Sequence, residues 1–501
     1  MILATVVASG CLLINTFHGD PTIYLIYARN IANGDLFSFN PGEFSSGSTS
    51  PLWALILSIG FIESDGILVA KLIGLILTLI ALMLSYKTLL LASKSSLGAV
   101  IGTALTSKYL TLPGLMLYES PLIVLLMFLL ILNSHYLFDG KQLTKRLVGL
   151  CIIWSLIPVS RPDASAIVVM NAAALAYHFY RRGERGLMAV ILVMLPVAFL
   201  PAVMYYGYSF AKLGVLSVSA YGRSFALKES APSLLGIFYS FGPLKFFLAS
   251  QMTIFLIPAV WGAWRWLDQD RRNPCALLAV LTVAFYFILL SLISPVARDV
   301  GRYIMPALPF FCVLTAIGVR EVWVLSCRHQ RSSVMLPLLV GLSLVPVVSV
   351  TNASWTESKR GLTFDVITER RIVEMINARA EKDATILIYE VQDRYYLRPD
   401  LKVLSLDGVT DGKVVPYLRD KDLSGFLMRY KPRYWLANDA VEYRPSLSSS
   451  ILKKVVEESR GKTNSRIQMG KIVFTKVADR AEPLIAGFAA FRELYKLDYE
   501  Q

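Results

Sequence analysis

Apolar segments about as long as a membrane is thick constrain the fold of this chain more than any other feature. Hydrophobic residues make up 55% of its 501 positions, and the mean hydropathy is +0.54. A helix needs about 20 residues to cross roughly 30 Å of hydrocarbon. We predict about eleven spans, several of them short, near residues 1–16, 67–92, 97–116, 120–137, 147–160, 164–180, 187–207, 246–265, 275–294, 303–326 and 334–350. The predicted fold class is a polytopic α-helical membrane protein.

Basic residues follow every second predicted span. The clusters include Lys94, Lys145, Arg182, Arg265 and Arg328. Because Lys and Arg accumulate in cytoplasmic loops, this alternation places the N-terminus in the cytoplasm and the C-terminus outside, in a multi-pass plasma-membrane protein. Since the basic residues cluster where membrane helices end, the net charge of +14 favours a lipid bilayer with anionic headgroups as partner, and no nucleic acid.

The last third of the chain differs in composition from the apolar part before it. Short β-prone runs alternate there with helical patterns, at 368–382, 384–389, 402–406, 423–430 and 433–437. This alternation predicts a small α/β domain. We therefore expect a membrane domain over 1–351 and an extracytoplasmic α/β domain over 352–501.

A long polar segment over residues 17–66, rich in Gly, Asn and Ser, follows the first predicted span. Irregular loops of this length are usually functional or disordered, and aromatic residues such as Tyr24, Phe39 and Trp53 argue against disorder. Residues 51–62 are apolar but too few to cross, which fits a helix lying at the membrane interface. We expect an ordered pocket at the membrane surface.

Two carboxylates lie beside predicted span ends on the outer face. Asp20 could act as a general base toward a hydroxyl at the headgroup level, or it could cap a helix that starts at Pro21. Glu119 could begin the next helix, where the helix dipole favours an acid. A charge beside the bilayer is costly unless it is paired or hydrated, which favours a functional role. From the residues alone, both alternatives stay open.

Arginines on the same face could bind a phosphate. Arg161 opens a short Arg-Pro-Asp turn that ends at Asp163. Arg161 either reaches toward the interface beside a capping Asp163 or binds phosphate oxygens with its paired donors. Arg298 and Arg302 offer the same chemistry.

The sequence contains no metal-ligand spacing. Its five cysteines form no CxxC pair, so neither a disulfide framework nor a zinc site is predicted, and of its four histidines only His18 lies on the outer face. We expect no metal cage made by protein ligands, although one acidic pair and a substrate phosphate could together hold a divalent cation. No P-loop, GxGxxG or nucleophile elbow occurs.

Several motifs resemble those of GT-C fold glycosyltransferases, in particular the arabinofuranosyltransferase-like branch of actinobacterial cell-wall enzymes. In the first external segment the similar residues are Asp20, 27–30 (YARN), Gly34, 39–43 (FNPGE) and 47–53 (GSTSPLW). Further along they are 118–122 (YESPL), 161–163 (RPD), 302–306 (RYIMP) and 388–411. The first segment is fairly specific, whereas the Arg-Pro-Asp turn alone is not.

The resemblance implies an inverting glycosyltransferase. It would move a pentose or hexose from a polyprenyl-phosphate donor to a cell-envelope glycan or glycoconjugate on the extracytoplasmic face, and the exported domain would bind the growing glycan. Asp20 would be the catalytic base, and Glu119 would orient the acceptor or raise the pKa of Asp20. The phosphate-binding residues would be Arg161, Arg302 and Arg298. The remaining candidate substrate contacts are His18, Tyr27, Asn40, Glu43, Ser48, Thr49 and Asp163.

The sequence also departs from the family pattern. Gly19 stands where the family usually has another acid, Pro21 replaces a small residue and Ile26 replaces an arginine. The missing acid weakens metal binding and keeps a catalytically inactive glycan-binding protein as an alternative. A lipid or glycan transporter is another alternative, but it predicts mid-span charges and paired broken helices. The charges here gather at one face, and no repeat is visible.

Overall fold

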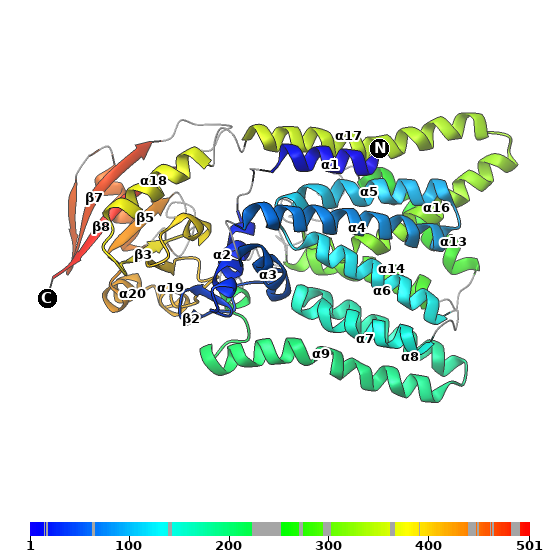
Figure 1. The fold of residues 1–501 in the computed structure, drawn as a ribbon, viewed down its shortest axis with the longest axis horizontal. Coiled ribbons are helices and arrows are strands. Elements are labelled where there is room, and N and C mark those ends of the chain that lie inside the picture. The colour runs from blue at the N-terminus through cyan, green and yellow to red at the C-terminus, as the bar shows by residue number, and fades with distance from the viewer. Residues whose placement is uncertain are drawn as a thin grey trace.

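The chain folds into a bundle of apolar helices with a smaller part built on a β-sheet at one end (Figure 1). This architecture is seen in a computed structural model. It describes the chain outside residues 15, 17–18, 63–65, 139–142, 223–251, 270–273, 294–301, 361–365, 390, 439–446, 448–449, 461, 463–464, 482–490 and 501.

Each predicted span overlaps a helix in the described part of the chain. In chain order these are α1 (Ile2–Leu12), α4 (Ile67–Ser93), α5 (Ser96–Leu115), α6 (Ser120–Phe138), α7 (Leu143–Ser160), α8 (Ser165–Arg181), α9 (Arg185–Leu213), α13 (Met252–Gln269), α14 (Pro274–Ile293), α16 (Leu308–Arg328) and α17 (Ser332–Arg360). Six of them, namely α4, α6, α7, α9, α16 and α17, are long and apolar enough to cross a membrane. Helix α1 has only 11 residues, short of the ~20 needed. The count of eleven spans and the orientation of the termini therefore stay predictions.

Close contacts at glycines bring helices α13 and α16 together. A Cβ atom on Gly318 of α16 would lie 1.7 Å from the carbonyl oxygen of Pro258. A Cβ atom on Gly262 of α13 would lie 2.1 Å from the carbonyl oxygen of Leu314. Small residues let helix backbones approach each other in an apolar surrounding. The two helices are therefore in direct backbone contact.

The first external segment is more regular than its composition predicts. It contains α2 (Pro21–Ala32), a hairpin of β1 (Ser38–Asn40) and β2 (Glu43–Phe44), α3 (Pro51–Ser58) and a 3-10 turn (Ile59–Phe61). A proline at the first position fixes the start of α2. Nine of the 12 residues of α2 are buried, so packing outweighs the turn-forming composition around the helix. The expectation of an irregular loop was wrong here. The helix expected at 51–62 is present, and its place at the membrane interface stays a prediction.

The C-terminal part is built on a six-stranded sheet of order β4-β3-β5-β8-β7-β6. Its strands are β3 (Thr385–Ile388), β4 (Lys402–Ser405), β5 (Tyr434–Asn438), β6 (Arg466–Met469), β7 (Ile472–Ala481) and β8 (Phe491–Tyr499). The three strands that the sequence predicted, β3, β4 and β5, pair in parallel, and β8, β7 and β6 extend the sheet in antiparallel pairing. The accompanying helices include α18 (Val366–Arg379), α19 (Val415–Arg419), α20 (Leu423–Tyr430) and α23 (Ile451–Ser459). Helix α17 runs past residue 352, and a separate exported domain stays a prediction.

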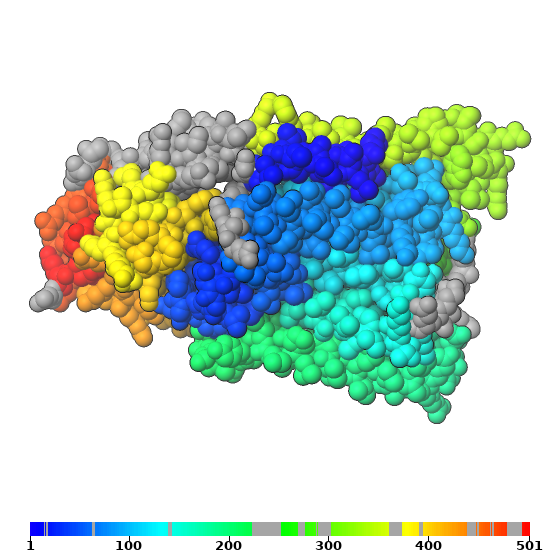
Figure 2. All heavy atoms as spheres, in the orientation of Figure 1, coloured from blue at the N-terminus to red at the C-terminus, as the bar shows by residue number. Residues whose placement is uncertain are grey.

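The β1–β2 hairpin joins the bundle to the edge of the sheet. The side-chain NH2 of Asn40 donates a hydrogen bond to the backbone carbonyl of Val403 in β4 at 2.8 Å. The side-chain oxygen of Asn40 accepts a hydrogen bond from the backbone N–H of Val403 at 2.9 Å. Glu43 forms ion pairs with Lys402 at 3.1 Å and with Lys413 at 2.8 Å. In Figure 2 the first external segment, in dark blue, lies against both parts. The hairpin thus covers the edge that β4 would otherwise expose.

We expect Asn40→Ala to loosen this joint. The substitution leaves the N–H and the carbonyl of Val403 without a partner, and each unsatisfied buried group costs about 1–3 kcal/mol. The apparent melting temperature of the purified full chain in detergent, followed by intrinsic fluorescence, should fall by several degrees. Asn352→Ala, at an exposed position of α17, is the matched control. Equal melting temperatures for the two variants would contradict this account of the joint.

Candidate active site

Four charged side chains from distant parts of the chain meet at the end of the bundle that faces the sheet. Asp20 precedes α2, Glu119 precedes α6, Arg161 lies between α7 and α8, and Arg302 precedes α16. Arg302 contacts Asp20 across 282 residues of sequence and Glu119 across 183. The sequence singled out all four residues, and the structure brings them into one cluster.

Asp20 points its carboxylate at Arg302. The two side chains form an ion pair between an Asp20 oxygen and the Nη1 of Arg302. Asp20 occupies the N-cap position of α2, as that alternative placed it, but its side chain makes no capping hydrogen bond to the helix. The proline at the first helical position removes one N–H that a cap would satisfy. The Asp20 side chain is 42% exposed, which leaves it open to a substrate.

Glu119 lies behind this pair and is almost fully buried, with 3% of its side chain exposed. Both of its carboxylate oxygens accept hydrogen bonds from Arg302, at 3.4 Å from Nε and 3.3 Å from Nη2. Arg161 donates to it at 3.4 Å and the hydroxyl of Tyr24 at 2.9 Å. Burial alone would raise the pKa of Glu119, but the charges of Arg302 and Arg161 outweigh it and lower the pKa to about 2. Glu119 is therefore an anion at neutral and mildly acidic pH.

Arg161 is buried, and each of its three guanidinium nitrogens is bonded to a protein group. Its Nε and Nη2 donate to the two carboxylate oxygens of Asp163, each at 3.1 Å. Its Nη1 donates to Glu119 and, at 3.0 Å, to the backbone carbonyl of Arg302. With 5% of the side chain exposed, Arg161 does not reach toward the interface, and that alternative was wrong. Every guanidinium nitrogen has a partner, so Arg161 holds the cluster together.

Arg302 is the guanidinium that connects the buried and exposed parts of the cluster. It contacts Glu119 on one side and Asp20 on the other, and its side chain is 18% exposed. Its Nη2 also donates to the hydroxyl of Tyr24 at 3.1 Å. The ring of Tyr118 lies 4.9 Å from its guanidinium carbon, within cation–π distance. Among the described cluster residues, Arg302 is the guanidinium that an incoming anion would meet.

Three residues that order the cluster, Tyr24, Tyr303 and Lys71, were not among the site residues predicted from the sequence. Tyr24 lies one helical turn after Asp20, a spacing that could have revealed it. Its hydroxyl is hydrogen-bonded to Thr49 at 2.8 Å as well as to Glu119. The ring of Tyr303 lies 5.3 Å from the guanidinium carbon of Arg161. Lys71 of α4 is a charge inside the predicted span 67–92, which is a local signal, but its two partners depend on tertiary contacts.

Lys71 ties together the two segments that carry the carboxylates. Its buried ammonium group donates to the carbonyl of Thr16, four residues before Asp20. It also donates at 2.6 Å to the carbonyl of Leu115, four residues before Glu119. One side chain thus fixes the start of both turns.

The remaining predicted substrate contacts lie in several places. Thr49 lies beside Tyr24, Asp163 holds Arg161, and the hydroxyl of Ser48 is buried with no hydrogen bond within the described part of the chain. Tyr27, Asn40 and Glu43 contribute to the joint with the sheet, where the Tyr27 hydroxyl bonds Ser45 at 2.8 Å. Those three are engaged by protein groups away from Arg302. His18 and Arg298 lie outside the described residues.

The cluster does not fit a divalent cation. Within the described ranges, no group of three His, Cys, Asp or Glu side chains is arranged to hold a metal. The guanidinium of Arg302 already pairs with both the Asp20 and the Glu119 carboxylate, and Arg161 pairs with Glu119. Two fixed positive charges there oppose a third. We derive no step through a metal.

The chain shares the GT-C fold with solved structures of low sequence identity. It matches the Archaeoglobus fulgidus oligosaccharyltransferase, in a complex with Zn and sulfate, with a TM-score of 0.54 and 11% identity over 87% of this chain and 68% of that one. It matches ArnT from Cupriavidus metallidurans bound to undecaprenyl phosphate with a TM-score of 0.54 and 10% identity over 98% and 97%. It matches the same ArnT in the apo state with a TM-score of 0.52 and 11% identity over 99% of this chain and 96% of that one. No protein-family model and no curated protein matches the chain.

The lowered pKa of Glu119 predicts acid sensitivity. An ordinary Glu titrates near pH 4.3 in the unfolded chain. Glu119 therefore stabilises the fold fully above that pH, and its contribution is lost as the pH falls toward 2. The melting temperature of Glu119→Gln should lie well below that of the wild type at pH 6, and the gap should narrow between pH 5 and pH 3.

The exposed Glu458 of α23 provides the control for this titration. Glu458→Gln should follow the wild-type curve throughout. A gap between the wild type and Glu119→Gln that stays constant from pH 6 to pH 3 would show that Glu119 is not held ionised by its arginines.

Proposed function

We propose that the chain is an inverting glycosyltransferase. It takes a pentose or hexose from a polyprenyl-phosphate donor and transfers it to a glycan or glycoconjugate on the extracytoplasmic face of the plasma membrane. The observation that carries the proposal is the partly exposed Asp20–Arg302 pair at the end of a bundle with the GT-C fold. The carboxylate can accept the proton of the acceptor hydroxyl, and the neighbouring guanidinium can stabilise the negative charge of the lipid phosphate.

Asp20 is the base in this proposal. It is the exposed member of the two carboxylates, whereas Glu119 is buried and held ionised by arginines. The acceptor hydroxyl gives its proton to Asp20 as its oxygen attacks the anomeric carbon of the donor sugar. One displacement forms the new glycosidic bond and breaks the bond to the phosphate oxygen. The configuration is therefore inverted, and the lipid phosphate leaves with the bonding electrons.

Arg302 stabilises the negative charge that develops on the lipid phosphate. In the present structure its Nη1 is paired with Asp20, so an incoming phosphate competes with that carboxylate. When the donor binds, Asp20 loses its cation and becomes a better base. Donor binding thus prepares the base in the same step that places the leaving group.

Glu119 and Arg161 position Arg302. The bidentate contact with Glu119 fixes the guanidinium plane, and Arg161 fixes the Arg302 backbone through its carbonyl. Neither residue needs to touch the substrate. Arg161, which the sequence predicted as a phosphate ligand, is almost fully buried and is bonded to protein groups through all three guanidinium nitrogens, so this proposal gives phosphate binding to the more exposed Arg302.

Several parts of the proposal rest on different support. The polyprenyl-phosphate donor is supported by the ArnT structure, which is bound to undecaprenyl phosphate. The arabinofuranosyltransferase-like branch rests on sequence motifs such as 39–43 and 302–306. The division into a membrane domain over 1–351 and an exported glycan-binding domain over 352–501 is supported by the position of the six-stranded sheet, which lies next to α2 at one end of the bundle (Figure 1).

Asp20→Asn tests the base. Transfer of label from a polyprenyl-phosphate sugar to a glycan acceptor in proteoliposomes should fall at least about 100-fold, because the amide cannot accept the proton. The dissociation constant for polyprenyl phosphate should stay the same or decrease, since no carboxylate then competes for Arg302. Asp420→Asn, at an exposed ion pair of the C-terminal part, should transfer normally.

Wild-type turnover by Asp20→Asn would remove Asp20 as the base. Donor binding without any transfer by the wild type would favour the glycan-binding alternative.

Arg302→Lys tests the phosphate site. A lysine keeps the charge but cannot contact Glu119 with two donors while also reaching the donor phosphate. We expect kcat to fall about 100-fold or more, with a raised KM for the lipid donor. Unchanged kinetic constants in the labelled-transfer assay would contradict the role given to Arg302.

A further inference from the structure

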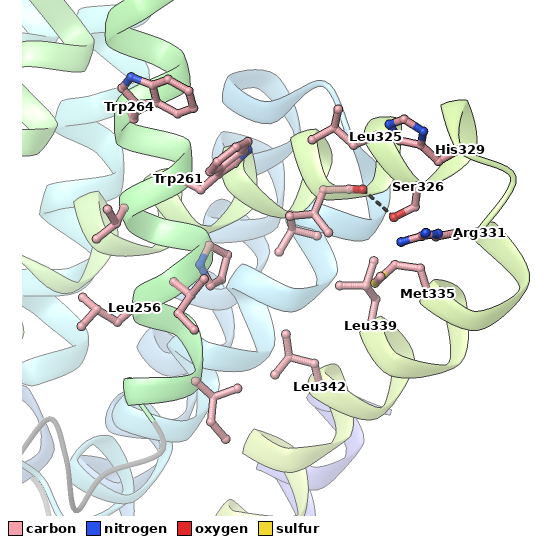
Figure 3. A pocket seen from close by; sticks show the side chains of 16 residues that line it. Leu256, Trp261, Trp264, Leu325, Ser326, His329, Arg331, Met335, Leu339 and Leu342 are labelled. Atoms are coloured by element: carbon pink, nitrogen blue, oxygen red, sulfur yellow. Dashed lines mark hydrogen bonds between the residues drawn. The ribbon is translucent and has the colours of Figure 1, made fainter.

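A groove of about 880 Å³ runs between α13, α16 and α17, away from the Asp20 cluster (Figure 3). Its lining is almost entirely apolar. The residues used below are Ile257, Trp261 and Trp264 of α13, Leu339 and Leu342 of α17, and Arg331 at the turn between α16 and α17. We call it the α13–α17 groove.

The shape of the groove follows from the helix contacts around it. Helices α13 and α16 touch through Gly262 and Gly318, so no side chains separate them there. Helix α17 leaves α16 at the turn around Arg331 and lines the other side of the groove. The groove is open along its length, since Ile257 is 78% exposed and Trp264 is 54% exposed.

The polar groups of the groove gather at one end. Figure 3 shows His329, Ser326 and Arg331 together near the turn, with the apolar side chains extending away from them. The Ser326 hydroxyl is satisfied by the carbonyl of Val322 at 2.8 Å. Arg331 is exposed and forms no ion pair within the described part of the chain, whereas Arg265 nearby is paired with Glu321 at 3.3 Å. Arg331 therefore places a positive charge without a carboxylate partner in the described part of the chain at one end of the α13–α17 groove.

The dimensions of the groove match one leaflet of a bilayer. The lining extends from Arg331, just before α17, to Leu342, 11 positions further along the chain, which corresponds to a rise of about 16 Å along a helix. Half of a ~30 Å hydrocarbon layer is about 15 Å. Helix α16, with 21 residues, separates this end from Arg302 by about 30 Å, so the groove opens at the opposite membrane surface from the proposed active site.

We propose that the α13–α17 groove binds one anionic phospholipid, with its phosphate at Arg331 and its acyl chains along α13 and α17. A guanidinium pairs with phosphate oxygens through two donors. Basic pockets between membrane helices are typical sites for anionic headgroups. A second copy of the chain would leave Arg331 facing the equally basic turn of its partner, which charge repulsion opposes. The occupant is thus a membrane lipid distinct from the sugar donor, and the proposal does not depend on glycosyl transfer.

Fluorescence quenching by brominated lipids tests the site, because Trp261 and Trp264 line the groove. The purified full chain in detergent is titrated with phosphatidylglycerol that carries dibrominated acyl chains, and separately with the matching phosphatidylcholine. We expect half-maximal quenching at a several-fold lower mole fraction of phosphatidylglycerol. Arg331→Gln should raise that fraction about five-fold. Arg328→Gln, an exposed arginine of the same turn that does not line the groove, should change it less than two-fold.

The eight tryptophans of the chain require one further variant. In Trp261→Phe/Trp264→Phe the preference for phosphatidylglycerol should disappear from the quenching signal, and its persistence would place the lipid elsewhere. Equal quenching of the wild type by both lipids would mean that the groove contacts surrounding lipids without selecting an anionic one. If Arg331→Gln and Arg328→Gln raise the half-maximal mole fraction equally, the preference for phosphatidylglycerol comes from the general charge of the surface and not from a site at Arg331. A dimer that excludes brominated lipid from these tryptophans would assign the groove to a second copy. Each of these results overturns the proposal.

Discussion

Glu119 is a carboxylate removed from water and held between two guanidinium groups, and the geometry of the candidate active site depends on that interaction. A lone buried carboxylate would cost many kcal/mol, and it persists because Arg161, Arg302 and Tyr24 all bond to it. Arg161 and Arg302 come from two different junctions of the helix bundle, and Tyr24 comes from α2. Loss of either arginine leaves the buried carboxylate only partly compensated, so the start of α6, the end of α7 and the start of α16 are held relative to one another.

Exposure separates the residues that hold the cluster from those that face solvent. Glu119 and Arg161 have 3% and 5% of their side chains exposed, whereas Asp20 and Arg302 have 42% and 18%. The buried pair therefore acts as a fixed support, and the exposed pair remains open to charged ligands. This arrangement follows the general need of an active site for a rigid second layer behind its reacting groups.

The sequence located the cluster but not its supports. Asp20, Glu119, Arg161 and Arg302 could be predicted because a charge beside an apolar span is costly and therefore conspicuous. Lys71 lies inside the predicted span 67–92 and is conspicuous for the same reason, but its two carbonyl partners could not be predicted, since they belong to segments 55 and 44 residues away. Family resemblance highlighted Asn40 and Glu43 without revealing that both contact the sheet.

The fold shows a similar division between local and tertiary information. Strands β3 to β5 were predicted because their apolar runs are uninterrupted. Strands β7 and β8 were not, because charged residues interrupt their pattern. Lys476 and Glu493 are nevertheless buried and paired at 2.7 Å between these two strands. Only the neighbouring strand turns these charges into a stabilising pair.

Helix α2 links the Asp20 carboxylate to the sheet through a rod of fixed length. Its 12 residues span about 18 Å. Asp20 lies at one end, and Arg29 in the last turn donates to the carbonyl of Tyr395 at 3.2 Å. A hydrogen-bonded helix does not shorten or bend as a loop does. Any thermal displacement of the sheet is therefore passed to the carboxylate as a rigid-body movement, with no intervening slack to absorb it.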